Sequence, residues 1–157
     1  MKNLLFVSLL ALVAFKTNAQ KLTTNEVDEF TGSVQKTTKE YKLFKGDNFG
    51  KLDVRARRVD STYYLYLSPR TDLGCVGTKD SYVIFIFDDG SKLKLDNDLA
   101  EIDCSKYASS IYHIDEENPI FTRSKRITRT RVGLSKYYQD YSPTGKYTLG
   151  ELFDAVK

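Results

Sequence analysis

The chain has 157 residues, with 24 Lys and Arg against 21 Asp and Glu, and a formal charge of +3 at pH 7. Aromatic residues make up 13% of the sequence, including eleven Tyr and no Trp, and 29% of the residues are charged. This composition excludes a disordered chain and favours a β-rich globule.

The first nineteen residues have the pattern of a secretory signal peptide. Lys2 provides a basic start, residues 4–15 form an apolar core, and small residues precede a cleavage point after Ala19. The apolar core is too short for a comfortable membrane span, and no second apolar segment follows it. We therefore predict a secreted or periplasmic protein without stable membrane insertion once residues 1–19 are removed.

Removal of this leader changes the charge balance. Because the leader holds Lys2 and Lys16 and no acidic residue, 22 of the 24 basic residues remain against 21 acidic ones. Without a large positive excess, nucleic-acid binding loses its main driving force, the release of counterions from phosphates. The remaining chain fits one domain, which we place at residues 29–157 after a flexible N-terminal segment at residues 20–28.

Residues 82–95 predict a β-hairpin at the centre of the fold. Residues 82–87 are apolar on both faces, which is typical of a strand buried on both sides. Asp89 and Gly90 tolerate the positive φ angles of a two-residue turn, and residues 92–95 alternate Lys with Leu. In this register, the numbers of facing residues sum to 179.

Cys75 and Cys104 are the two cysteines of the chain. An even number of cysteines in an exported protein predicts a disulfide, and these two numbers also sum to 179. A thiol pair for metal or redox chemistry is the alternative, but the chain has no CxxC motif and only one His. We therefore predict a disulfide between the two residues and no cofactor.

Two meander strands are predicted before the hairpin, at residues 51–58 and 62–67, because apolar and polar side chains alternate there. Pro69 ends the second strand, since proline lacks a donor for the sheet. Residues 29–44 suit one long, partly exposed strand or two short ones. The outward positions of the two meander strands provide ligand-surface candidates, namely Arg55, Arg57, Tyr64 and Tyr66.

An acidic segment follows the hairpin. Asp96, Asp98 and Glu101, together with Asp103, could provide the oxygen ligands that calcium prefers, although their spacing does not match an EF-hand loop. The alternative is a helix start, in which Asp98 caps the helix and Glu101 reaches back from three residues later. We favour the helix start and predict no metal site.

His113 lies in a predicted strand at residues 109–114. No Ser or Cys has a local nucleophile motif to pair with His113. A hydrolase would need His113, or two carboxylates from a set of four, in one cleft. That set is Asp88, Asp96, Asp98 and Asp103. We predict that the protein is not an enzyme.

Residues 123–131 are the densest basic run, with five basic residues in nine. Strand alternation places Ile127, Arg129 and Arg131 on one face and residues 128, 130, 132 and 134 on the other. The arginines would discourage pairing between sheet edges.

A functional alternative joins Arg129 and Arg131 to Arg55 and Arg57 in one surface that binds phosphate, sulfate or acidic glycans. Aromatic residues follow this basic run and fit either a strand or a contact surface for carbohydrate or protein. The candidates among them are Tyr137 and Tyr138.

Two helical segments are predicted near the C-terminus. Asn118 before Pro119 favours a short helical turn. Thr148 and Glu151 form a capping-box pattern, which predicts an amphipathic helix. Its apolar positions are Leu149, Leu152, Phe153 and Val156.

The segments DEFTG (28–32), DSYVIFIFDDGS (80–91) and NDLAEIDC (97–104) resemble small exported proteins of Bacteroidota that have no assigned function. The resemblance implies an exported protein and supplies no catalytic residues.

From the strand pattern itself we predict a mainly β domain. About seven or eight antiparallel strands form a meander, which folds into a partly closed barrel or a two-layer sandwich. The short C-terminal helix completes the domain. The favoured function is a non-enzymatic domain that binds an unknown protein, glycan or small molecule. The alternatives are a small-ligand carrier with a barrel cavity and a carboxylate- or His-dependent hydrolase.

Overall fold

The computed structural model describes residues 22–46, 50–70, 81–97, 99–100, 110–115, 117–121, 125–134, 137–146 and 148–157. The helical elements are the 3₁₀ turn η1 (Pro119–Phe121) and the helix α1 (Leu149–Asp154). The strands are β1 (Leu22–Val27), β2 (Val34–Thr38), β3 (Tyr41–Gly46), β4 (Lys51–Val59), β5 (Thr62–Arg70), β6 (Tyr82–Phe87), β7 (Lys92–Asp96), β8 (Leu99–Ala100), β9 (Ser110–Ile114), β10 (Ile127–Leu134) and β11 (Tyr137–Pro143).

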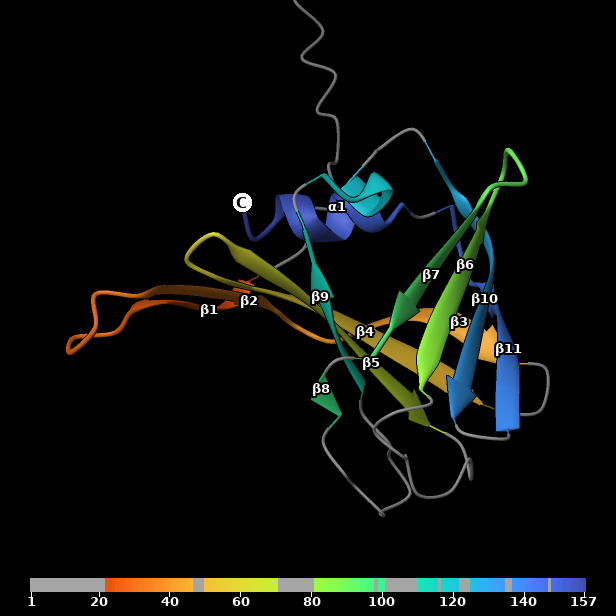
Figure 1. Ribbon diagram of the computed structural model, residues 1–157, viewed down its shortest axis with the longest axis horizontal. Helices are drawn as coiled ribbons and strands as arrows, with labels where there is room; N and C mark the ends of the chain where they lie inside the picture. The colour runs from red at the N-terminus through yellow and green to blue at the C-terminus, as the bar shows by residue number, and fades with distance from the viewer. Residues whose placement is uncertain are drawn as a thin grey trace, which may run out of the picture.

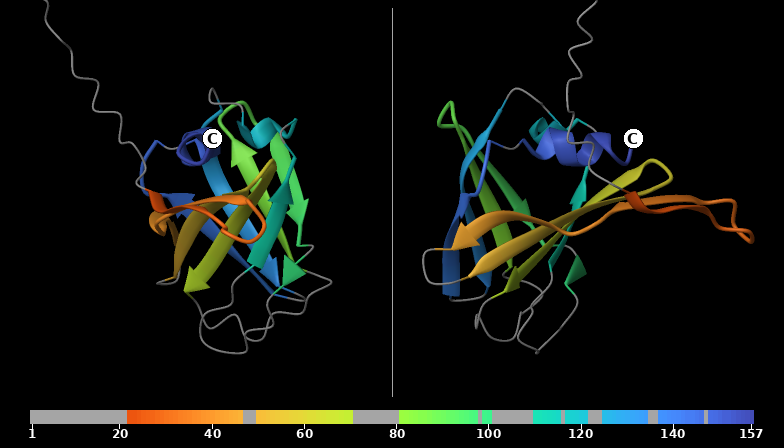
Figure 2. Two further views of the ribbon diagram at one scale, coloured as in Figure 1. Left: turned by 90° about the vertical axis from the view of Figure 1, so that its left-hand side faces the viewer. Right: turned by 180° about the vertical axis from the view of Figure 1, so that it is seen from behind.

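All eleven strands of the described residues belong to one antiparallel sheet, which confirms the predicted mainly β fold. The main path runs β7-β6-β10-β11-β3-β4-β5-β9-β8, while β2 pairs with β4 and β1 pairs with β2 off this path. The sheet curls around one core, and its two end strands in the described chain, β7 and β8, are not paired with each other (Figure 2). The result is a curled sheet that is not closed, and the described residues form more strands than the predicted seven or eight.

The inner face of the sheet and α1 form one hydrophobic core. On β4 and β5, alternate residues are completely buried and their neighbours face outward, as expected for a sheet with one wet face. The largest buried side chains include Tyr112, Tyr141, Phe44, Phe85 and Phe153. Figure 1 shows α1 across one end of the curled sheet.

The C-terminal helix begins as the sequence predicts. The Thr148 hydroxyl accepts from the Glu151 amide at 3.2 Å, and the Glu151 carboxylate accepts from the Thr148 amide at 3.1 Å. Leu149, Leu152 and Phe153 are buried against the core. At η1, the Asn118 side chain accepts from the Ile120 amide, which confirms the short predicted turn. No described helix is long and apolar enough to span a membrane.

The β6–β7 hairpin forms, but its register differs by one residue from the prediction. Val83 faces Leu95, so the numbers of facing residues sum to 178. The turn has three residues, because the Phe87 amide donates to the Ser91 carbonyl at 3.0 Å and Gly90 has a φ of +80°. The prediction of equidistant cysteines is therefore wrong, and both cysteines lie outside the described residues.

The prediction that β6 is buried on both faces is also wrong. Val83, Phe85 and Phe87 are buried, whereas Tyr82, Ile84 and Ile86 are half-buried on the outer face. The outer face remains partly open because an antiparallel sheet of this kind covers only one side with its core.

A β-bulge explains a third error, in β10. The register with β6 shifts between Ile127 and Arg129, so that Ile127 turns inward beside Thr130 and Val132. Arg129 is exposed and Arg131 is half-buried on the outer face. The extra residue at this bulge breaks the strict alternation on which the prediction depended.

Three other segments differ from prediction. Residues 22–27, expected to be flexible, form β1 and pair with β2. β5 continues through Pro69 to Arg70, because it pairs with β9 only over Tyr63 to Leu67 and the proline needs no donor there. Leu99 and Ala100 form β8 against β9, so the chain there is a strand and not the start of a helix.

Candidate functional site

Two outer-face surfaces hold the arginine and tyrosine candidates. The β4–β5 surface comprises Arg55, Arg57, Tyr64 and Tyr66. On this surface, Arg55 faces Tyr66 and Arg57 faces Tyr64 across the two strands, as the antiparallel register requires. All four side chains are half-buried, whereas their neighbours Val54, Ala56, Leu65 and Leu67 point into the core.

Contacts within the β4–β5 surface hold the arginines against the tyrosines. The Arg55 guanidinium lies 4.5 Å from the centroid of the Tyr66 ring. Arg57 Nη1 donates to the Tyr66 hydroxyl at 3.2 Å, and Arg57 Nη2 donates to Gln35 Oε1 of β2 at 2.9 Å. Each arginine is therefore positioned by neutral groups, which orient the guanidinium without cancelling its charge.

No carboxylate of the described chain forms an ion pair with Arg55 or Arg57. Asp53 precedes Arg55 by two positions on β4, but only 1% of Asp53 is exposed. Arg55 Nε is buried and has no hydrogen-bond acceptor among the described residues. Two guanidinium groups whose charge is not neutralised by a carboxylate are the arrangement that binds the oxygens of an anion.

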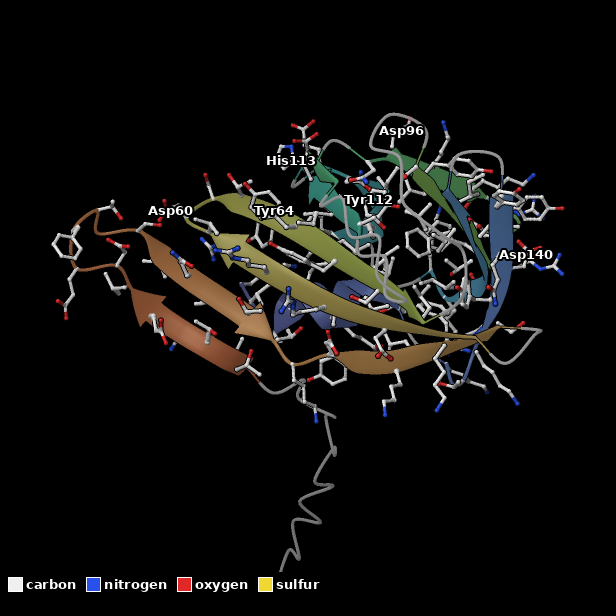
Figure 3. All side chains as sticks on the ribbon, turned by 90° about the horizontal axis from the view of Figure 1, so that it is seen from below. Asp60, Tyr64, Asp96, Tyr112, His113 and Asp140 are labelled. Carbon is white, nitrogen blue, oxygen red and sulfur yellow. The ribbon has the colours of Figure 1, made fainter. Side chains whose placement is uncertain are left out.

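His113 extends the β4–β5 surface onto β9. It faces Tyr64 in the register, and the centroids of the two rings lie 5.8 Å apart. Figure 3 shows both side chains on the same side of the sheet. His113 Nε2 lies 3.9 Å from an oxygen of Asp115, which is itself exposed. This geometry places His113 as a neighbour of the surface tyrosines.

The second group is the β10–β11 surface, which comprises Arg129, Arg131, Tyr138 and Asp140. Arg131 forms a bidentate pair with Asp140, at 2.6 Å from Nε to Oδ1 and 2.8 Å from Nη2 to Oδ2. The Arg131 guanidinium also lies 4.0 Å from the Tyr138 ring centroid, and Arg129 Nε is 4.0 Å from Asp140 Oδ2. Here Asp140 compensates the charge of Arg131, while Arg129 lies at the limit of an ion pair with the same carboxylate.

Electrostatics agree with this pairing. Hydrogen bonds from Arg131 hold the pKa of Asp140 below its ordinary value, and the hydrogen bond to Asp140 raises the pKa of Arg131. Both groups therefore stay charged over the whole neutral range, and each neutralises the other.

The predicted single anion surface does not form. β11 and β3 lie between β10 and β4 in the sheet, so that Arg129 and Arg131 are separated from Arg55 and Arg57. Figure 3 shows Tyr64 and Asp140 well apart on the molecule. Tyr137 precedes Tyr138 on β11 and faces Leu134 of β10 in the register. Tyr137 is 70% exposed.

Other predicted sites are only partly visible. Asp96 is exposed and its Oδ1 lies 2.5 Å from Lys94 Nζ, whereas Asp98, Glu101 and Asp103 lie outside the described residues. Within the described ranges, no cluster of three or more His, Cys, Asp or Glu side chains could hold a metal ion. The calcium alternative and the cysteine pair remain predictions.

The described carboxylates proposed for hydrolysis do not converge. Asp88 follows the end of β6, while Asp96 faces Tyr82 at its start. A strand of this length separates them by about 20 Å. Lack of enzyme activity stays a prediction. For the carrier alternative, Val83, Phe85 and Phe87 already occupy the interior side of β6, while Ile84 points outward.

Sequence reasoning missed Gln35 and Asp140, which decide the character of the two surfaces. Gln35 lies in a polar segment of β2 with no motif, and Arg57 reaches it across 22 positions. Asp140 could have been found by aligning residues 127–134 with 137–143 as a hairpin, because that alignment places it opposite Arg131.

No protein-family model, no curated protein and no solved structure matches the chain.

Proposed function

We propose that the protein is an exported, non-enzymatic binding domain that uses the β4–β5 surface to hold an acidic glycan. The observation that carries this proposal is the pair Arg55 and Arg57, which are ordered by neutral partners and have no carboxylate partner in the described chain. Sulfate or carboxylate oxygens would complete the donor set of these guanidinium groups.

The tyrosines favour a sugar over a free inorganic anion. Tyr64 and Tyr66 are half-buried, so each presents part of an aromatic ring beside the charges. An aromatic ring combines apolar area with a polar hydroxyl, which suits the mixed faces of a sugar ring. Arg55 and Arg57 lie two residues apart on one strand face, about 7 Å, so an extended polymer with repeated charges can contact both.

Export is part of the proposal, since the ligand class lies outside the cytoplasm. It is supported by the signal-peptide pattern of residues 1–19 and by the resemblance to small exported proteins of Bacteroidota. The Cys75–Cys104 disulfide belongs to the same proposal. Mass spectrometry with and without reductant would detect the loss of two hydrogens that accompanies the bond.

The test is titration of the chain from residue 20 onward with a sulfated hexasaccharide and with its unsulfated counterpart. Charge-assisted hydrogen bonds contribute about 1.5–3 kcal/mol, so Arg55→Gln and Arg57→Gln should each weaken binding of the sulfated sugar about tenfold or more. Arg129→Gln, on the other surface, should change the affinity less than about twofold.

Salt separates the charge contribution from the rest. Binding should weaken as ionic strength rises, because exposed charge pairs are screened. Equal affinity for the two sugars, or equal losses for Arg57→Gln and Arg129→Gln, would exclude the proposed site.

A further inference from the structure

The hairpin of β1 and β2 carries an exposed apolar tip. We call it the arm tip, and it comprises Val27, Phe30 and Val34, which are 62%, 98% and 39% exposed. Val27 faces Val34 as the last pair of the hairpin, and Phe30 lies in the loop between them. An apolar cluster of this kind on a protruding element marks an interaction surface.

The loop that carries Phe30 is held in a defined shape. Asp28 Oδ1 accepts from the amides of Phe30 and Thr31 at 2.9 and 2.7 Å, and the Asp28 carbonyl accepts from the Gly32 amide at 2.8 Å. Gly32 has a φ of +71°, which closes the loop. These hydrogen bonds hold the backbone of the loop so that Phe30 is exposed. Little backbone entropy is therefore lost when Phe30 binds a partner.

Acidic residues surround the arm tip. Glu26, Asp28 and Glu29 lie within four positions of Phe30, and Asp60 binds the Val34 amide at 2.8 Å through Oδ1. The nearest cations are Lys36 of β2 and Arg58 of β4, which face each other and both donate to the Lys157 carbonyl; Arg58 Nε also donates to the Asp60 carbonyl. A partner for the arm tip therefore needs an apolar patch with positive charges around it.

The outer face of β6 has this character. Ile86 lies between Lys92 of β7 and Arg129 of β10 in the register, and Ile84 lies between Lys94 and Arg131. We call these six residues the receiving face. Both isoleucines are half-buried although they belong to no core, and Lys92 has no ion-pair partner in the described chain.

Two of the four cations of the receiving face, Lys94 and Arg131, already have a carboxylate partner within the molecule. Asp89 in the β6–β7 turn pairs with Lys125 at 3.1 Å, Asp96 pairs with Lys94, and Asp140 pairs with Arg131. The row formed by Lys92, Ile86 and Arg129 holds the two cations whose charge is least compensated by a carboxylate. Arg129 reaches Asp140 only at 4.0 Å.

The arm tip and the receiving face cannot meet within one molecule. Figure 1 shows the hairpin of β1 and β2 projecting from one end of the longest axis, with β6, β7 and β10 near the other end. Figure 3 likewise shows Asp60 beside the arm and Asp140 beside β10 at opposite ends. Contact between them requires two molecules.

We propose that the arm tip of one molecule docks on the receiving face of a second copy, with Phe30 packed against Ile84 and Ile86. Glu26 and Glu29 would then lie beside Lys92 and Arg129. Because the two surfaces differ, each added copy leaves one arm tip and one receiving face free, which gives open head-to-tail chains. This contact uses none of the residues of the β4–β5 surface and stands apart from the proposed glycan site.

The experiment measures the mass of the chain from residue 20 onward by sedimentation velocity over a wide concentration range. The average mass should rise continuously with concentration at low salt and fall when salt is added. Phe30→Ser should make the protein monomeric, and so should the double variant Lys92→Glu/Arg129→Glu. Tyr137→Ser, which removes another exposed aromatic, and Lys45→Glu/Lys51→Glu, which reverses two exposed lysines elsewhere, should assemble like the unmodified protein.

Mixing the two monomeric variants identifies the contact. Phe30→Ser keeps an intact receiving face and the double variant keeps an intact arm tip, so an equimolar mixture should form dimers and nothing larger. Circular dichroism spectra that match the unmodified protein show that each variant is folded. A protein that stays monomeric at every concentration would overturn the proposal. A mixture that stays monomeric would also overturn it. So would a Lys92→Glu/Arg129→Glu variant that still associates by itself, because arm-to-arm pairing predicts that result.

Discussion

The two arginine–tyrosine surfaces both combine arginines with tyrosines, but they differ in how far the charge of the arginines is neutralised. On the β10–β11 surface, the Arg131 guanidinium lies over the Tyr138 ring, and both carboxylate oxygens of Asp140 accept hydrogen bonds from it. On the β4–β5 surface, Arg57 is bound by the Tyr66 hydroxyl and by the amide of Gln35. One surface contains its own counter-ion, and the other leaves room for an external one.

The comparison shows that the charge of one acceptor side chain decides whether an arginine is already neutralised or can bind an external anion. Asp140 and Gln35 occupy equivalent roles, since each supplies an oxygen from a neighbouring strand to a guanidinium. Their difference in charge is therefore the variable to change, and isosteric substitutions change little else.

Among the substitutions that change these acceptors, Gln35→Glu has the largest expected effect. The substitution places a carboxylate where Gln35 Oε1 now lies 2.9 Å from Arg57 Nη2. The new ion pair should compete with the ligand and weaken binding of the sulfated sugar about tenfold, or about 1.4 kcal/mol. Titration of both proteins measures this loss. Gln35→Ala is the control and should keep the affinity within about twofold; a similar loss in both variants would mean that the amide itself contacts the ligand.

A smaller effect is expected from Asp140→Asn, which opens the β10–β11 surface. A bidentate ion pair of this exposure contributes about 1 kcal/mol, so the free energy of unfolding should fall by that amount at pH 7. Urea denaturation measures it. Asp96→Asn removes the exposed partner of Lys94 and should cost almost nothing. Equal costs for the two variants would contradict the distinction between these ion pairs.

The same substitution has a defined pH dependence. Since hydrogen bonds from Arg131 lower the pKa of Asp140 below 3.8 in the folded protein, ionised Asp140 stabilises the fold above that pH. Its contribution is lost as the pH falls below 3.8. The stability difference between the unmodified protein and Asp140→Asn should therefore be constant near neutral pH and shrink in acid.

The smallest effect is expected from Tyr66→Phe. The variant keeps the ring beside Arg55 and removes the hydroxyl that accepts from Arg57. A single half-exposed hydrogen bond contributes about 0.5 kcal/mol, so stability and sugar affinity should both fall only slightly. Tyr64→Phe is the matched control, because no described residue bonds to the Tyr64 hydroxyl. A larger loss in the control would place the ligand over Tyr64.

Strand pattern and capping signals were sufficient to predict the fold class. The alternation in residues 51–58 and 62–67 reflects direct contact with the core, and the Thr148–Glu151 box reflects local hydrogen bonds. Both signals act within a few residues, so the sequence contains them in full.

Errors arose where one extra residue or a distant partner decided the outcome. The three-residue turn at Asp88 to Gly90 and the bulge before Arg129 each shift a register by one position, and alternation alone does not detect such insertions. The four arginine positions were identified from sequence, but their division into two surfaces depends on β11 and β3 lying between them. That order is set by pairings between remote segments.

The pairing of β3 with β11 has a consequence for how the protein reaches its fold. Tyr141 faces Gly46 and Pro143 faces Phe44, so this contact joins segments separated by 95 to 99 positions. Closing so long a loop costs conformational entropy before the new contacts can stabilise the sheet. Sheets dominated by remote pairings therefore fold in milliseconds to seconds. Until β11 is in place, β3 has one open edge, and the β4–β5 hairpin must form its own contacts without support from β10 and β6.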